Sequence, residues 1–226
     1  MNNLLFTFAL LVTFSCTNVN KENDLKDIIS SDLKFSNNKE FNNVMDLMNP
    51  NLFEVITRIL PRISSDLKKF SNYSNNKEFD KVMDLMNPNL FEVVTREELI
   101  QSWENLGTEV GMNNKLGIPV ITNISEIYNF KQNKYLLVNY TGDLTTIISG
   151  QLLLGIDVLK EGIISKYSPK SASFKFEEST NTFYFKELQQ SIIGMAKANS
   201  NDWRYVQLNN AFIKDILPLE VIEKFK

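Results

Sequence analysis

Residues 75–96 read NNKEFDKVMDLMNPNLFEVVTR, and residues 37–58 repeat them almost unchanged as NNKEFNNVMDLMNPNLFEVITR. The two copies differ at three positions only, Asn42/Asp80, Asn43/Lys81 and Ile56/Val94. Two near-identical copies indicate a recent duplication, because a solenoid needs about three units or more to bury its core. We therefore expect one copy to belong to the folded domain and the other to be an added segment.

Helix signals fill the second copy. Apolar residues recur there at helical spacing, at Phe79, Val82, Met83 and Met86. Asn87 ends this helix because a residue that precedes proline avoids the α region, and it also suits the cap of a second short helix that starts at Pro88. The second helix is expected to bury Leu90, Phe91, Val93 and Val94.

A capping box follows the second copy. Thr95 and Glu98 have the Thr-to-Glu spacing of that motif, which predicts a third helix that stops at Gly107. The inner face of the third helix is predicted to consist of Leu99, Ile100, Trp103 and Leu106. We interpret these methionines and aromatic residues as core rather than as a cofactor site.

The first copy lacks this continuation. After Arg58 the chain reads Ile59-Leu60-Pro61, so the capping box is lost and the proline is expected to interrupt the helix. We therefore assign residues 75–226 to the domain and residues 37–74 to a duplicated helical segment with its linker. The alternative is that the first copy displaces the second from the same groove, which would permit swapping between protomers.

The second half of the domain carries strand patterns. Residues 118–148 contain β-branched and aromatic runs around a polar turn, which predicts an antiparallel pair. Residues 151–167 change to a helical period, with a strand pair as the alternative. Further strands are expected at Phe174 to Phe176, Phe183 to Phe185, residues 191–198 and residues 203–208, before a short helix at residues 215–222. Helices followed by an antiparallel sheet with a helical insertion predict an α+β fold.

Composition excludes several classes of function. The 226 residues are 43% apolar, which is enough for a substantial core. The chain contains no histidine, so Ser-His-Asp and Cys-His catalysis and most zinc sites are excluded. The basic residues form no cluster at a net charge of −3, so no nucleic-acid partner is expected. No phosphate-binding or calcium loop is present, and we predict no cofactor and no metal.

The N-terminus resembles a bacterial lipoprotein signal. Residues 4–14, LLFTFALLVTF, form an apolar run of signal-peptide length that ends at Ser15 and the single cysteine, Cys16. This resemblance implies that residues 1–16 end at a lipidated Cys16 and that residues 17–36 form a tether. The expected location is the bacterial cell envelope, anchored to a membrane and preferably the outer membrane. The alternative is a plain signal peptide and a secreted or periplasmic protein.

The hydrophobic pattern of the domain resembles the nuclear transport factor 2-like (cystatin-like) fold, and more narrowly Bacteroidota envelope proteins with that fold. The resembling segments are residues 79–106, 134–140, 181–185, 202–205 and 216–221. The resemblance implies a cone, in which a curved antiparallel sheet wraps around the N-terminal helices. The insertion at residues 152–167 departs from the minimal fold.

Enzymes of this fold place an Asp or a Tyr in the cone to move protons beside a carbonyl. Near the candidate pocket strands this chain has Tyr128, Tyr140, Asp143 and Asp157. The preferred interpretation is that the tyrosines are half-buried strand residues and that the aspartates are solvated, so no catalytic residue is assigned. Tyr128, Tyr140 and Asp143 remain weak candidates for ligand binding.

Three hypotheses of function follow. The first is a non-catalytic, membrane-tethered module whose cone takes an apolar small molecule or the side chains of an envelope protein. The second is a small-molecule isomerase or dehydratase that uses Tyr and Asp as acid and base. The third is a protein-docking surface made by the duplicated helices. Two ionisable groups that face each other in an open cavity would favour the enzyme.

Overall fold

The structure is a computed structural model that describes residues 54–226. The predicted signal peptide, Cys16, the tether and most of the first repeat copy lie outside the described residues. In residues 54–226, every helix is too short or too polar to cross a membrane.

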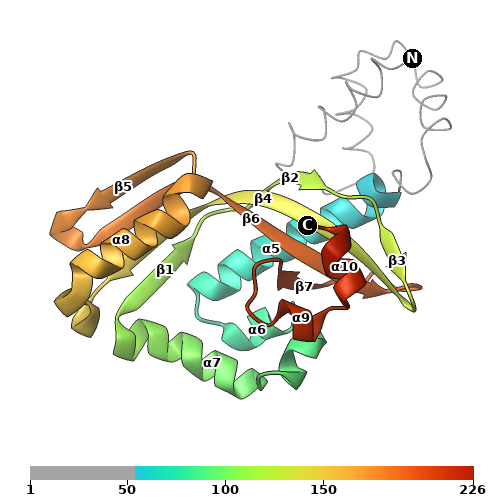
Figure 1. Cartoon of the computed structure of the whole chain (residues 1–226), viewed down its shortest axis with the longest axis horizontal. Helices are drawn as coiled ribbons and strands as arrows, with labels where there is room; N and C mark the ends of the chain where they lie inside the picture. Colours follow the sequence, from blue (N-terminus) through green and yellow to red (C-terminus); the bar gives the residue numbers. More distant parts are fainter. Residues whose placement is uncertain (1–53) are drawn as a thin grey trace, which may run out of the picture.

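The described residues form one strongly curled, seven-stranded antiparallel sheet with helices on both faces, so the predicted α+β class is confirmed (Figure 1). The strands are β1 (Met112–Leu116), β2 (Val120–Ile124), β3 (Tyr128–Phe130), β4 (Asn133–Ile148), β5 (Ser173–Glu177), β6 (Thr182–Lys197) and β7 (Arg204–Gln207). The 16-residue strands β4 and β6 pair along their whole length. At one end β2 and β3 extend the sheet beyond β4 and β7 extends it beyond β6, and at the other end β1 and β5 do so.

The helical elements come mostly before and between the strands. They are π-helix η1 (Val55–Ile59), α5 (Leu60–Asn75), α6 (Phe79–Met83), 3₁₀-helix η2 (Pro88–Glu92), α7 (Arg96–Asn105), π-helix η3 (Leu106–Val110), 3₁₀-helix η4 (Gly150–Gly155), α8 (Ile156–Tyr167), 3₁₀-helices η5 (Ser168–Lys170) and η6 (Glu178–Thr180), α9 (Ile213–Ile216) and α10 (Leu219–Lys224). The predicted helix at residues 215–222 is thus two short helices, because Pro218 separates them.

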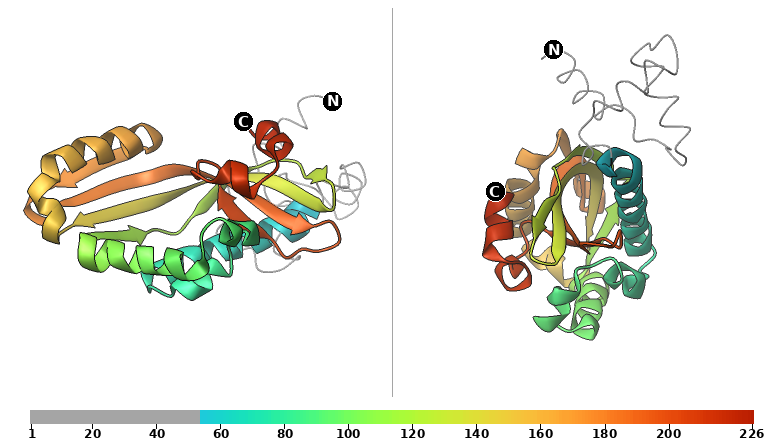
Figure 2. Two further views of the ribbon diagram at one scale, coloured as in Figure 1. Left: turned by 60° about the horizontal axis from the view of Figure 1, so that its bottom comes forward. Right: turned by 90° about the vertical axis from the view of Figure 1, so that its right-hand side faces the viewer.

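Alternate residues of β4 are buried on opposite faces of the sheet, because successive side chains of a strand point to opposite sides. Leu136 and Val138 lie in one cluster with Ile63 and Leu67 of α5. Tyr135 lies on the other face, in a cluster with residues of α9 and α10. Figure 2 shows α5 and the C-terminal helices on opposite sides of the strands.

The far half of the long strands is covered by α8, which confirms the predicted helical insertion. Ile163 of α8 packs in a third cluster with Leu144 and Ile148 of β4 and with Phe183 and Phe185 of β6. Since Leu144 and Ile148 continue the alternation of Leu136 and Val138, α8 and α5 cover two halves of one face.

The second repeat copy folds largely as its pattern predicts. Val82 and Met83 of α6 and Leu90 of η2 are buried, and the Asn87 side chain caps η2 by accepting from the Asn89 amide. The capping box is present, with Thr95 and Glu98 bonded reciprocally at the start of α7.

Two details of this region are corrected. Val93 is 39% exposed rather than buried. Gly107 does not stop the third helix, because the chain continues through η3 to Val110. The helix stops at Gly111, whose φ of 89° lies in the left-handed region that glycine adopts most easily. The expected inner face of α7 is half-buried, and no residue of α7 is fully buried.

Residues 55–75 form an unbroken helical segment that packs on the sheet. Pro61 does not interrupt it, because the proline lies in the first turn of α5, where its missing amide hydrogen is tolerated. Ile59 and Ile63 are at most 1% exposed. Residues that we placed in the duplicated segment and linker therefore supply part of the core, and the packed unit begins before residue 75.

A buried carboxylate ties α5 to β7. The Asp66 side chain is fully shielded from solvent, with Arg62 Nε at 2.9 Å and Lys69 Nζ at 3.5 Å. The Tyr205 hydroxyl donates to Asp66 Oδ2 at 3.1 Å. Burial, together with the Asp66 carboxylate, raises the pKa of the Tyr205 phenol. These partners offset part of the cost of burying the Asp66 charge, since both hydrogen bonds go to Oδ2 and Oδ1 has no hydrogen-bond partner among the described residues.

Candidate functional site

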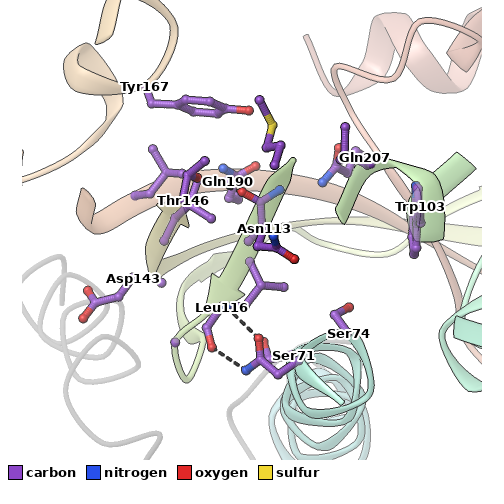
Figure 3. Close-up of a pocket in the computed structure, with 18 of the residues that line it drawn as sticks. Ser71, Ser74, Trp103, Asn113, Leu116, Asp143, Thr146, Tyr167, Gln190 and Gln207 are labelled. Carbon is purple, nitrogen blue, oxygen red and sulfur yellow. Dashed lines mark hydrogen bonds between the residues drawn. The ribbon is translucent and has the colours of Figure 1, made fainter. Parts of the chain in front are cut away.

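An open cavity of about 1210 Å³ lies on the face that α5 and α8 share. Its walls come from α5, from the end of α7 with η3, from β1 and from α8. Its floor is the middle of β4 and β6 (Figure 3). The volume exceeds the range of about 300–1,000 Å³ that is usual for small-molecule sites.

A β-bulge shapes the floor of the cavity. The register of β4 and β6 shifts between Gly142 and Leu144, and Glu187 opposite adopts a φ of 50°. Asp143 holds this bulge, because it accepts hydrogen bonds from Lys186 Nζ at 2.5 Å and from the Glu187 amide at 3.0 Å. The Lys186 hydrogen bond, helped by the Glu187 amide, lowers the pKa of the Asp143 carboxyl.

The first residue of the second repeat copy joins two walls. Asn75, at the end of α5, donates from Nδ2 to the Leu116 carbonyl and accepts from the Leu116 amide, both at 2.8 Å. Figure 3 shows this pair of hydrogen bonds below the cavity. The residue that follows β1 also packs closely against β4, since a Cβ on Gly117 would lie 2.8 Å from Asp143 Cβ. The end of α5 is therefore fixed to the β1 edge.

Uncharged polar side chains occupy the middle of the cavity. Gln190, Asn113 and Thr146 project there from β6, β1 and β4, and Gln207 reaches it from β7 (Figure 3). Thr146 donates to Asn114, and Asn113 donates to the Gly107 carbonyl. Within residues 54–226, Gln190 and Gln207 have no side-chain hydrogen-bond partner.

Aromatic rings form parts of the walls. Trp103 of α7 is half-buried and packs edge-on against Phe79, with 5.6 Å between the ring centroids. Tyr167, at the end of α8, lies 5.5 Å from the ring of Phe185. Figure 3 shows Trp103 and Tyr167 at well-separated places along the cavity, with the polar side chains between them.

The structure brings together two of the four residues considered from sequence. Tyr140 and Asp143 both line the cavity. Tyr128 lies elsewhere, packed edge-on against Phe225 at 6.3 Å beside α10. Asp157 is exposed in the first turn of α8 and does not line the cavity.

Neither cavity residue is set up as a general acid or base near neutral pH. Burial raises the pKa of Tyr140 to about 12, so its phenol stays protonated. Asp143 is ionised and paired with Lys186. An acid–base catalyst needs a pKa close to the working pH, and these two groups are shifted away from it in opposite directions.

Sequence reasoning missed the polar floor of the cavity. Trp103 was interpreted as core, and Gln190 and Gln207 were not singled out. The available signal was the polar run Gln189-Gln190-Ser191 between the apolar residues Leu188 and Ile192.

Comparison with known proteins gives no match for this chain: no protein-family model, no curated protein and no solved structure matches it. In the part of the chain that the structure describes, no group of three or more Cys, Asp or Glu residues lies close enough to hold a metal ion.

Proposed function

We propose that the protein is a non-catalytic binding module of the bacterial cell envelope, held at a membrane by a lipid on Cys16. Its ligand enters the cavity between α5 and α8. The observation that supports binding over catalysis is the cavity itself, which is large and open, while the pKa shifts of Tyr140 and Asp143 make neither suited to proton transfer near neutral pH.

We further propose that the domain is a variant of the nuclear transport factor 2-like cone. Support comes from the curled antiparallel sheet with α5 against one face. The insertion at α8 lengthens that face, because α8 covers strand residues beyond the bulge. In this proposal the cone opens at the junction between the α5 half and the α8 half.

The chain offers a matched pair of variants to test the cavity. Gly162 lines it, and a Cβ there would meet no atom within 4 Å. Gly162→Phe therefore introduces a bulky side chain at the lining, with open space for its Cβ. Gly155 has equally free space but does not line the cavity, so Gly155→Phe is the control.

The experiment is mass spectrometry of the small molecules that remain bound to protein purified from its native membrane. We expect a compound that is retained by wild type and by Gly155→Phe, and at least about tenfold depleted in Gly162→Phe. Equal retention by all three proteins, or none by any, would contradict a binding cavity.

The anchor is tested separately. Cys16→Ser is expected to move the protein from the membrane fraction to the soluble fraction, because acyl chains supply about 0.8 kcal/mol for each buried methylene. Thr17→Ser is the matched control and should stay in the membrane fraction. Unchanged membrane attachment of Cys16→Ser would refute the lipid anchor.

A further inference from the structure

We infer that the ligand of this cavity is a carbohydrate chain of more than one sugar unit. The inference rests on the proposed binding function and adds the chemical class of the ligand. Its support is the combination of unpaired amides, a described lining without arginine and separated aromatic rings in one large cavity.

The amides are accessible to a ligand that both donates and accepts hydrogen bonds. Gln189, Gln190, Gln207, Asn105 and Asn209 line the cavity, and among the described residues none of their side chains has a hydrogen-bond partner. A primary amide carries two donor hydrogens and an acceptor oxygen, and a sugar hydroxyl likewise donates and accepts. A chain of hydroxyl-bearing rings therefore matches this set group by group.

An acyl chain is a poor match for these amide side chains. Gln190 lies in the middle of the cavity, so a hydrocarbon placed along the floor would displace water from it without replacing the hydrogen bonds (Figure 3). Each polar group left in that condition costs about 1–3 kcal/mol. A purely apolar ligand along the floor would therefore leave Gln190 without hydrogen-bond partners.

The charges that line the cavity do not form an arginine-based site for a phosphate or carboxylate group. The cationic side chains are Lys77, Lys166 and Lys170, and the anionic ones are Glu104 and Asp143. Asp143 is neutralised by Lys186, which lies outside the lining. Recognition of an anion such as phosphate or carboxylate relies on converging cations, often an arginine fork, and no arginine of residues 54–226 lines the cavity.

Two aromatic rings provide apolar surfaces for the faces of sugar rings. Trp103 and Tyr167 lie at separate places along the cavity, with Gln190 and Asn113 between them (Figure 3). A pyranose presents C–H groups on its face and hydroxyls around its edge, so a face contacts an aromatic ring while the edge reaches the amides. Two separated rings imply two or more sugar units.

Tryptophan fluorescence provides a direct assay. The chain has two tryptophans, of which Trp103 lines the cavity and Trp203 is fully buried in the α5 cluster. The probes are cellotetraose, maltotetraose, chitotetraose and mannotetraose, titrated to millimolar concentration. We expect at least one to change the emission in a saturable way, and the change to be absent in Trp103→Phe.

The variant Gln190→Leu tests the amides. We expect it to weaken binding of the active tetrasaccharide by about tenfold or more, because it removes hydrogen bonds to the sugar. The exposed turn residue Gln132 does not line the cavity, so Gln132→Leu is the control and should bind as wild type does. Equal binding by both variants would overturn the role of the amides.

The fatty acid cis-parinaric acid separates failure of the ligand class from failure of the binding function. If it binds and no tetrasaccharide does, the cavity binds apolar ligands and the carbohydrate inference is wrong. If neither binds but the Gly162→Phe comparison shows a retained compound that is not a carbohydrate, the inference is again wrong and the binding function stands. If all three tests are negative, both proposals are wrong.

Discussion

Replacing Tyr205 by phenylalanine is the sharpest test of how the cavity wall is held. The Tyr205 hydroxyl donates to Asp66 Oδ2 at 3.1 Å and so joins β7 to α5, which forms one wall of the cavity. Phenylalanine keeps the ring that packs beside the α5 cluster and removes only the hydroxyl. The change therefore leaves a fully shielded carboxylate with one hydrogen bond fewer.

The expected loss follows from the partners that remain. A hydrogen bond to a charged group contributes about 1.5–3 kcal/mol net. Arg62 at 2.9 Å and Lys69 at 3.5 Å still neutralise Asp66, but both are 45% exposed and lie on α5 itself. We therefore expect a loss of about 2 kcal/mol in the free energy of unfolding.

Urea denaturation followed by circular dichroism measures this loss. The midpoint should fall while the slope with urea stays constant, since the surface exposed on unfolding is unchanged. Tyr184→Phe is the control, because Tyr184 is 36% exposed and its hydroxyl has no hydrogen-bond partner among the described residues. The control should lie within about 0.5 kcal/mol of wild type. A Tyr205→Phe value equally close to wild type would refute the reasoning.

Three further predictions concern residues in or beside the cavity. Asn75→Ala removes both hydrogen bonds to Leu116 and should cost about 1–2 kcal/mol of unfolding free energy in a urea titration, with no loss contradicting the junction. Gly111→Ala should cost about 2 kcal/mol or more, measured in the same way, because φ is 89° and the new Cβ would lie 2.1 Å from the Ser149 carbonyl oxygen. Tyr140 has a pKa near 12 in the folded state against 10.0 unfolded, so its contribution to stability is complete below pH 10 and falls by about 2 kcal/mol as the pH rises to 12. Urea titrations at pH 9 and pH 11.5 should show a smaller alkaline loss for Tyr140→Phe than for wild type.

Short sequence patterns predicted the helices whose start or period is set by residues close together in the chain. The Thr95–Glu98 box starts α7, and the helical period of residues 151–167 corresponds to η4 and α8. Strand β1 was not predicted, because MNNKL is polar and becomes a strand only by pairing with β4. Strand β6 was expected as separate pieces, since the polar residues at its bulge interrupt the apolar alternation.

The two repeat copies show that nearly identical residues adopt different structures when different residues follow them. Residues 55–58, VITR, lie in π-helix η1. The matching residues 93–96, VVTR, connect the end of η2 to the start of α7, with Thr95 as the N-cap. Glu98 supplies the second half of the cap in one copy, and Leu60-Pro61 continues a helix in the other. The cavity could not be predicted either, since it depends on where α5, α7, β1 and α8 meet over the sheet.

The length of β4 and β6 has a consequence for how the molecule unfolds. Both strands run without interruption from the α5 half to the α8 half, and the bulge beneath the cavity is the irregularity in their pairing. Loss of either half would remove pairing partners that the same two strands present to the other half. Neither half is therefore an independent folding unit, and amide hydrogens on both sides of the bulge should exchange with deuterium in a single all-or-none transition.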